Sequence, residues 1–174
     1  MKDTVFTGRV WVITDKNNRL IADIDTDQIF HNAHLHITEI NQMGPYTFGN
    51  LEGWKDFPGK VKPGDMVIVG PNFGAGSSRQ QAVDCFTALG VKLIMAVSFG
   101  AIYKRNAINS GFPILIFDTA EKLVAENKIK NLANVKVDLL SGRLTVEETK
   151  ETFQLMPFSK VQKDIYEKDT LLNI

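Results

Sequence analysis

Cysteine is almost absent from this sequence, which has Cys85 as its single thiol among 174 residues. A disulfide within the chain needs a second cysteine, and iron–sulfur clusters are held by several cysteine thiolates. The chain therefore forms no internal disulfide, and it has no set of thiolates that could hold such a cluster on its own.

Net charge of either sign is also lacking, because 20 Lys and Arg residues balance 20 Asp and Glu residues. No long basic run offsets this balance, so we expect neither nucleic acid nor a membrane as a partner. No stretch reaches the roughly 18 consecutive apolar residues of a membrane-spanning helix, and the opening MKDTVFTGRV lacks the apolar segment of a signal peptide. A soluble cytoplasmic protein is the simplest prediction.

What the sequence does contain is enough apolar material, 44% of its residues, for one packed domain over residues 1–174. Short apolar runs alternate with segments of helical spacing, an order typical of parallel strands joined by right-handed helical crossovers. The predicted strands are 8–14, 66–69, 91–97 and 113–117, and the predicted helices are 82–89 and 102–110, stopped by Gly90 and Gly111.

The C-terminal part of the chain has a different pattern. Residues 135–139 and 144–146 alternate between apolar and polar on either side of a Ser-Gly turn, which predicts an antiparallel hairpin. Asp118 and Glu121 resemble a capping box that opens a helix. We also expect a strand near residues 153–155 and a last helix over 158–167. The predicted fold class is α/β with an antiparallel appendage.

Residues 15–60 show neither pattern clearly. They are rich in Asp, Asn, Gly and His and contain only short apolar pieces. We therefore expect a long, partly ordered loop, a kind of segment that is usually functional or disordered. Trp54 and Phe57 are expected to pack within it or against a partner.

The segment Gly70–Arg79, GPNFGAGSSR, is a candidate anion-binding junction between a buried strand and a helix that we expect to begin near Ser78 or Arg79. Its glycines allow the backbone to approach a ligand closely, and the first amides of a helix point outward toward negative charge. Ser77 and Ser78 are good helix caps, and the planar guanidinium of Arg79 suits a carboxylate or a phosphate. An ordinary glycine-rich turn with a serine cap is the alternative.

Two nucleotide-binding motifs fit this junction poorly. A Walker A loop needs a lysine before its last serine or threonine, and none is present. A dinucleotide fingerprint needs a third glycine where Arg79 stands, and an acidic residue after the next strand, where Val97 is followed by Ser98. A small carboxylic acid is the better anion.

Three blocks of sequence together resemble a known family. GPNFGAGSSR, the later SFGAIYKRNAINSGFPIL at residues 98–115, and IDTDQI at residues 24–29 occur in the order found in the small subunit of 3-isopropylmalate dehydratase, a swivel domain of the aconitase superfamily. The resemblance covers about residues 7–117. It implies a three-layer swivelling β/β/α domain with residues 118–174 added as a C-terminal hairpin and helix.

The resemblance also implies a function. The chain would be the small subunit of a two-chain hydro-lyase that isomerises a 2-hydroxy dicarboxylic acid, most simply 2-isopropylmalate to 3-isopropylmalate in leucine biosynthesis. A homoaconitate or 2,3-dimethylmalate-type hydratase and a stand-alone carboxylate-binding module are the alternatives. A [4Fe–4S] cluster would lie on the large subunit and none on this chain, in agreement with the single cysteine. The stoichiometry of the two subunits, and homo-oligomers of the isolated chain, stay open.

Residue roles follow from the resemblance motif by motif. Ser77 would be the catalytic base, and Ser78 and Arg79 would bind a substrate carboxylate. Thr26 and Asp27 would face the active site, with Asp27 orienting a histidine of the large subunit.

The acidic block that contains Asp27 could also be interpreted as a calcium loop. Such a loop of the helix-loop-helix kind needs Gly at its sixth position and Glu at its twelfth, which here are Gln28 and His34. We therefore expect no metal there.

The histidines gather in one short stretch, with His31, His34 and His36 following an HxxHxH pattern. A zinc site lacks an evident fourth ligand, and a solvated loop is the plain alternative. By resemblance, His34 to Ile37 is the loop that discriminates between substrates, and His36 would contact the substrate. A neutral His36 could flank an alkyl group, and a protonated one could pair with a carboxylate.

Overall fold

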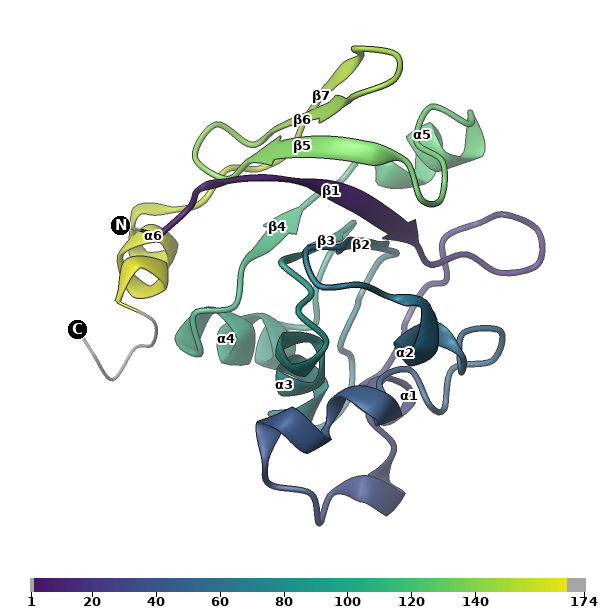
Figure 1. Ribbon diagram of the computed structural model, residues 1–174, viewed down its shortest axis with the longest axis vertical. Coiled ribbons are helices and arrows are strands. Elements are labelled where there is room, and N and C mark those ends of the chain that lie inside the picture. The colour runs from purple at the N-terminus through teal and green to yellow at the C-terminus, as the bar shows by residue number, and fades with distance from the viewer. Residues whose placement is uncertain (1, 169–174) are drawn as a thin grey trace.

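A mixed sheet organises the computed structural model, which describes residues 2–168 (Figure 1). Its strand order is β4-β3-β2-β1-β5-β6-β7, so β1 joins a parallel half to an antiparallel half. The strands are β1 (Val5–Val12), β2 (Met66–Val69), β3 (Leu93–Ala96), β4 (Ile114–Ile116), β5 (Asn134–Asp138), β6 (Arg143–Val146) and β7 (Thr152–Gln154).

The parallel half forms as the sequence predicts. β1 to β4 pair in parallel, and every residue of β2 and β3 is buried, as expected for strands covered on both faces. The crossover helices are α3 (Gln81–Ala88) and α4 (Ala101–Asn109), each within a residue or so of its predicted ends. Gly90 stops α3 with a φ of +76°, which favours glycine.

The predicted hairpin is present and belongs to the same sheet. β5 pairs antiparallel with both β1 and β6, and β6 pairs with β7. The helices α5 (Ala120–Ala125) and α6 (Lys160–Glu167) complete this part. The predicted capping box of Asp118 and Glu121 is wrong: Thr119 precedes the helix, and no side-chain hydrogen bond caps it. A box counted from Thr119 would need Glu or Gln at position 122, which is Lys.

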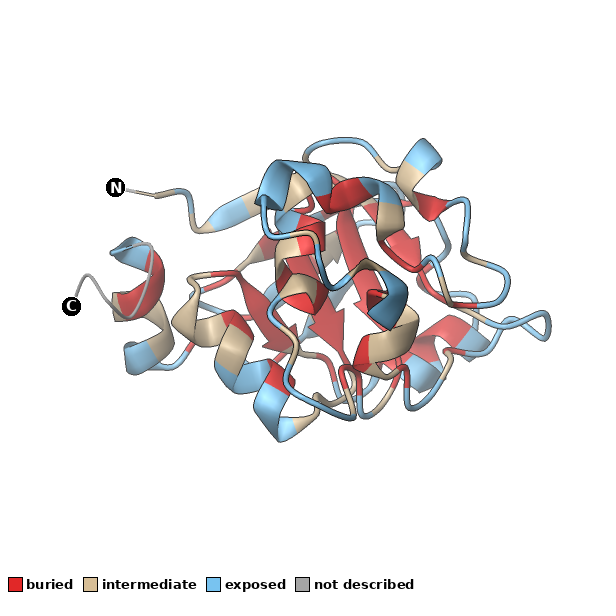
Figure 2. Cartoon of the chain, turned by 90° about the horizontal axis from the view of Figure 1, so that it is seen from below, coloured by how far each residue is buried: buried red, intermediate tan, exposed pale blue. Residues whose placement is uncertain are grey.

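Two apolar cores lie on opposite faces of the parallel strands. Figure 2 shows buried strands behind helices that also carry exposed residues. One face packs against α3 and α4. The other packs against the antiparallel half, where Met66 and Leu93 share a cluster with Val135 and Leu144. The resulting layers are one of helices and two of strands, which matches the predicted three-layer β/β/α arrangement.

No long helix and no strand forms within residues 15–60, as predicted for a loop region, but the segment is packed against the core rather than loosely ordered. The segment forms α1 (Thr26–Ile29), three single 3₁₀ turns and α2 (Phe57–Lys60), and it lies across α3 on the side away from the sheet (Figure 1). The 3₁₀ turns are Asn32–His34, Ile40–Gln42 and Gly44–Tyr46. Phe30, Phe48 and Phe57 are fully buried in the helical-side core, so long-range packing of apolar side chains orders it.

An ion pair between the half-buried Arg9 and the buried Asp65 fixes the start of β2, the strand that leads into the glycine-rich segment. Asp65 accepts hydrogen bonds from Arg9 Nη2 at 2.7 Å, from Trp11 Nε1 at 2.8 Å and from the Lys62 amide at 2.9 Å. Burial opposes ionisation of Asp65, but the bonds from Arg9, Trp11 and Lys62 outweigh it and lower its pKa.

We predict that Asp65→Asn lowers the free energy of unfolding by about 2 kcal/mol at pH 7, because charge-assisted hydrogen bonds are replaced by weaker ones. The folded-state pKa of Asp65 lies below its unfolded value of about 3.9, so its stabilisation is present above that value. It is lost as the pH falls through the lowered folded-state pKa. Urea unfolding at pH 7 and pH 3 should therefore show a smaller gap between variant and wild type at pH 3. An equal gap at both pH values would contradict the prediction.

Candidate active site

The glycine-rich segment and the acidic block lie side by side. The Gly74 amide donates to the Ile24 carbonyl at 2.8 Å, and the Thr26 amide donates to the Ala75 carbonyl at 2.9 Å. These bonds form a short parallel bridge between Asp25 and Ala75. The fold thus joins two motifs that are about 50 residues apart in the sequence, as the resemblance implies.

Ser77 and Ser78 do not cap a helix, contrary to the sequence prediction. α3 begins only at Gln81 and has no side-chain cap. Gly76 has a φ of +96°, and both serines after it lie exposed in an irregular turn. Ser78 Oγ accepts a hydrogen bond from Asn106 Nδ2 at 3.0 Å, and the Ser77 hydroxyl makes none to residues 2–168. Ser77 is therefore free to meet a ligand.

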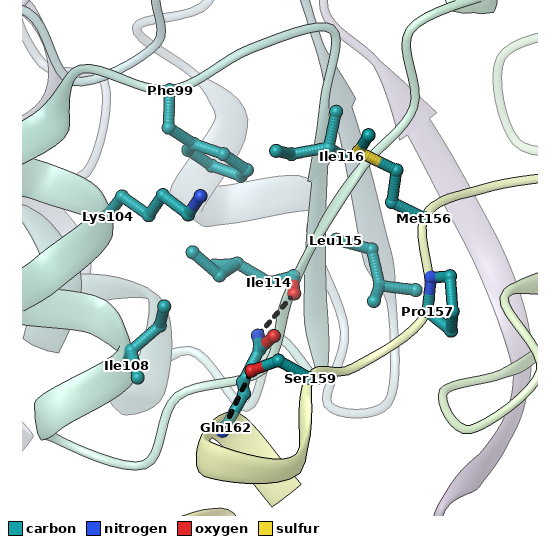
Figure 3. A pocket seen from close by; sticks show the side chains of 10 residues that line it. All are labelled: Phe99, Lys104, Ile108, Ile114, Leu115, Ile116, Met156, Pro157, Ser159 and Gln162. Carbon is teal, nitrogen blue, oxygen red and sulfur yellow. Dashed lines mark hydrogen bonds between the residues drawn. The ribbon is translucent and has the colours of Figure 1, made fainter.

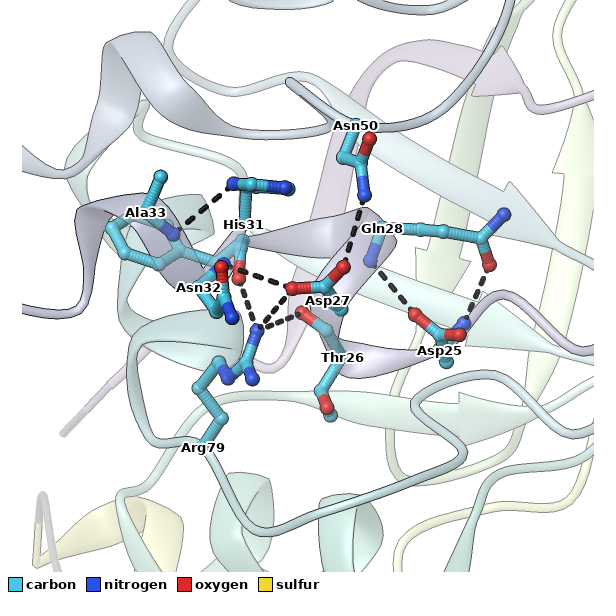
Figure 4. Close-up of polar contacts among 10 residues, drawn as sticks. Asp25, Thr26, Asp27, Gln28, His31, Asn32, Ala33, Asn50 and Arg79 are labelled. Atoms are coloured by element: carbon cyan, nitrogen blue, oxygen red, sulfur yellow. Dashed lines mark hydrogen bonds and ion pairs between the residues drawn. The ribbon is translucent and has the colours of Figure 1, made fainter.

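Arg79 is anchored along one edge of its guanidinium group (Figure 4). Its Nη1 donates to the Phe30 carbonyl at 2.6 Å and to Asp27 Oδ1 at 3.2 Å. The same nitrogen makes a longer contact of 3.4 Å with the Thr26 carbonyl. The side chain is only 11% exposed. Nε and Nη2 have no hydrogen-bond partner among the residues that the structure describes. A fork of two donors thus stays available for a carboxylate.

Asp27 connects three segments of the chain. Its Oδ1 accepts from the Asn32 amide at 2.8 Å and from Arg79, and its Oδ2 accepts from Asn50 Nδ2 at 3.0 Å. Burial acts to raise its pKa, but the hydrogen bonds from Asn32 and Arg79 and the charges of His31 and Arg79 lower it overall. Asp27 is therefore a carboxylate at neutral pH, and it holds Arg79 in place.

The remaining residues of the acidic block have structural partners. Asp25 caps α1 in a capping box with Gln28, since each side chain accepts a hydrogen bond from the backbone amide of the other residue. Asp23 accepts from Asn72 Nδ2 at 2.9 Å. Thr26 is buried beneath Gly76, where an added Cβ atom would lie 3.5 Å from its hydroxyl. Thr26 thus supports the loop from below.

The three histidines lie in different surroundings. His31 Nδ1 accepts from the Ala33 amide, and the His34 ring stacks on Tyr46 with 4.1 Å between ring centroids. His36 is exposed at the rim of a surface hollow that Tyr46 also lines. Gln81 Nε2 donates to the Leu35 carbonyl at 3.3 Å and so ties this loop to the start of α3. Residues 2–168 contain no group of three or more His, Cys, Asp or Glu side chains arranged to hold a metal ion.

A separate pocket opens between α4, β4 and the segment before α6 (Figure 3). Ile114, Met156 and Gln162 are among its lining residues, and Gln162 Nε2 closes its wall by donating to the Ile114 carbonyl at 2.7 Å. None of the site residues predicted from the sequence lines this pocket, so it is not part of the candidate site.

Comparison with known proteins identifies the origin of this arrangement. Residues 16–119 match the family model of the aconitase C-terminal domain. The chain belongs to this family. A 3-isopropylmalate dehydratase small subunit from Aliarcobacter butzleri is 32% identical over 96% of this chain and 92% of that protein. A methanogen homoaconitase small subunit from Methanocaldococcus jannaschii is 31% identical over 93% of this chain and 90% of that protein.

A solved structure agrees with these matches. A crystal structure of 3-isopropylmalate dehydratase from Methanocaldococcus jannaschii matches with a TM-score of 0.82 at 30% identity, covering 97% of this chain and 92% of that one. The resemblance inferred from the three sequence blocks and the predicted swivel-type α/β fold are both confirmed.

This aconitase C-terminal domain is unsuited to hold an iron–sulfur cluster itself. Cys85 is completely buried in α3, and that burial raises the pKa of its thiol to about 12. An iron–sulfur cluster is held by several cysteine thiolates, and this chain has one cysteine. A cluster that this family implies therefore does not fit the residues of this chain.

No helix among the described residues is long and apolar enough to cross a membrane.

Proposed function

We propose that this chain is the small subunit of a two-chain hydro-lyase that isomerises a 2-hydroxy dicarboxylic acid, with 2-isopropylmalate to 3-isopropylmalate as the first candidate reaction. The observation that supports it most is the pairing of an exposed Ser77 with an anchored Arg79 on one surface loop. The family match and the names of the relatives agree with it. A large subunit that carries a [4Fe–4S] cluster would supply Lewis-acid chemistry for the hydroxyl.

Ser77 is the proposed base. In dehydration its alkoxide takes a proton from the carbon next to the one bearing the hydroxyl, the C–H and C–O bonds break, and an alkene, a neutral Ser77 hydroxyl and a hydroxide ion form. In rehydration the Ser77 hydroxyl gives that proton to the carbon that bore the hydroxyl, and the hydroxide adds to the neighbouring carbon, which regenerates the alkoxide. A serine hydroxyl is a very weak acid, so it must be held as an alkoxide by positive charge nearby. Arg79, two residues away in the chain, is the nearest such charge in the loop.

Arg79 and Ser78 are the proposed carboxylate-binding groups. Asp27 and two backbone carbonyls occupy Nη1 of Arg79. The N–H groups of Nε and Nη2, on another edge of the guanidinium, have no hydrogen-bond partner among the described residues. That edge matches the two oxygens of a carboxylate. Ser78 lies beside it in sequence and adds a hydroxyl. Thr26 and Asp27 complete the site by holding the loop and Arg79.

His36 is the proposed contact for the group that distinguishes one substrate from another. An isopropyl group would pack against its neutral ring, and the extra carboxylate of a homoaconitate-type acid would pair with its protonated form. The homoaconitase relative makes the second substrate class a specific alternative.

The test is a substrate panel on the complex of this chain with its cognate large subunit, kept reduced and loaded with iron. We expect isomerisation of 2-isopropylmalate, and the measurement is the formation of the 3-isomer. Turnover of only homoaconitate or 2,3-dimethylmalate would keep the reaction but change the substrate. Binding of a hydroxy acid by the chain alone, with no turnover by the complex on any acid of the panel, would favour the stand-alone carboxylate-binding module.

A further inference from the structure

Asn50 is a residue of the candidate site that neither sequence motif contains. It lies outside the acidic block and outside the glycine-rich loop, yet its Nδ2 donates to Asp27 Oδ2 at 3.0 Å (Figure 4). The two residues are 23 positions apart in the sequence. We infer that Asn50 is a positioning residue that acts through Asp27 to hold Arg79 in its substrate-binding orientation.

The two oxygens of Asp27 have different partners. Oδ1 faces Arg79 and the Asn32 amide, while Oδ2 faces Asn50. The Asp27 side chain is 41% exposed, so the carboxylate is held by these hydrogen bonds rather than by close packing. Without Asn50, Oδ2 has no hydrogen-bond partner among residues 2–168, and the carboxylate can turn Oδ1 away from Arg79.

The turn that carries Asn50 is rigidly supported. Phe48 and Leu51, on either side of it, are 0% and 2% exposed. The Phe48 amide donates to the Ile29 carbonyl at 2.8 Å, which ties this turn to α1, the helix that carries Asp27. Asn50 is therefore fixed relative to Asp27 by a packed core and by a backbone bond.

Arg79 depends on the segment that Asn50 braces. Its Nη1 is held by Asp27 on one side and by the Phe30 carbonyl on the other, and both partners belong to that segment. A small displacement of a group that binds substrate weakens binding markedly. The inference rests on the proposed function, because Arg79 is taken there as the carboxylate-binding group.

The first experiment is Asn50→Ala in the complex, with Asn17→Ala as control, since Asn17 is exposed and its side chain makes no hydrogen bond among the described residues. We expect Asn50→Ala to raise KM about 10-fold with a smaller change in kcat. The Asn32 amide donates a hydrogen bond to Asp27 Oδ1. In the isolated small subunit, hydrogen exchange of this amide with solvent should therefore become about 10-fold faster in the variant. Unchanged KM and unchanged Asn32 exchange would each overturn the inference.

The second experiment is Asn50→Asp, which places one carboxylate against another near His31 and Arg79. Two carboxylates that share a site raise the pKa of one of them, so the pair takes up a proton as the pH falls. We expect KM for the variant to improve from pH 8 to pH 6 relative to wild type. Asn131→Asp is the control, because Asn131 Oδ1 only accepts, from the Val12 amide, and an aspartate can do the same. A flat profile for Asn50→Asp would contradict a role through Asp27.

The two readouts separate this inference from the proposed function. If the wild-type complex turns over no hydroxy acid, the proposed function fails. The exchange of the Asn32 amide in the isolated chain then decides whether Asn50 positions Asp27.

Discussion

Replacing Ser77 with alanine in the reconstituted complex is expected to lower kcat by about 10³-fold, because general-base catalysis contributes on the order of 10²–10⁴-fold and alanine has no hydroxyl. Ser77 is exposed and its hydroxyl makes no hydrogen bond within residues 2–168. Its loss should therefore leave the melting temperature of the subunit within about 1 °C of wild type. Steady-state kinetics and thermal unfolding on the same samples check both parts.

Two serine variants serve as comparisons for Ser77→Ala. Ser141 lies in the turn between β5 and β6, far along the chain from the site. The Ser141→Ala complex should therefore keep full activity. Ser78→Ala removes a proposed carboxylate contact and the acceptor for Asn106, so it should raise KM more than it lowers kcat. A Ser77→Ala complex that retains activity within a factor of about ten of wild type would show that Ser77 is not the base.

Gly74→Ala is expected to have the largest effect on stability, a loss of about 2–5 kcal/mol in the free energy of unfolding. Gly74 has a φ of +81°, a conformation that costs an L-residue about 1–2 kcal/mol. A Cβ atom there would also overlap the ring of Tyr103, whose hydroxyl is held by the Ala82 carbonyl at 2.9 Å. Forcing atoms into a packed core adds about 1–3 kcal/mol. Chemical denaturation of the isolated subunit measures the sum.

Two other glycines separate the causes of this loss. Gly53 has a φ of +85°, but an added Cβ atom would meet nothing within 4 Å, so Gly53→Ala should show the backbone cost alone. Gly59 lies in α2 with open space and no positive φ, so Gly59→Ala should be neutral or stabilising. If Gly74→Ala costs no more than Gly53→Ala, the contact with Tyr103 is not what requires glycine at position 74.

The regular elements could be predicted from the sequence because their causes are local. The apolar runs at 66–69 and 91–97 have the length of buried strands, the alternation at 135–139 shows the period of a strand, and each of the three segments contains a strand. Gly90 and Gly111 end helices that begin with clear apolar spacing. These patterns depend only on residues close together in the sequence, and the folded chain forms the strands and helices that they predict.

The contacts of the site could not be predicted because they join distant segments. Arg79 meets Asp27 across 52 positions, and Asn50 meets Asp27 across 23. Nothing in the local sequence of Asn50 distinguishes it from a turn residue. The order of residues 15–60 likewise comes from burial of Phe30, Phe48 and others against α3, which composition alone does not reveal. The three motif blocks indicated which segments meet, but not which atoms.

The most direct test of a shared active site is a competition between wild-type and Ser77→Ala chains for a limiting amount of large subunit. If this chain supplies the base to a site that another chain completes, neither subunit alone turns over substrate, and activity rises to saturation as wild-type chain is added. The Ser77→Ala chain should bind equally well and reduce activity in proportion to its share of the mixture. Activity that is unaffected by an excess of Ser77→Ala chain, or that the large subunit shows alone, would contradict a base supplied by this chain.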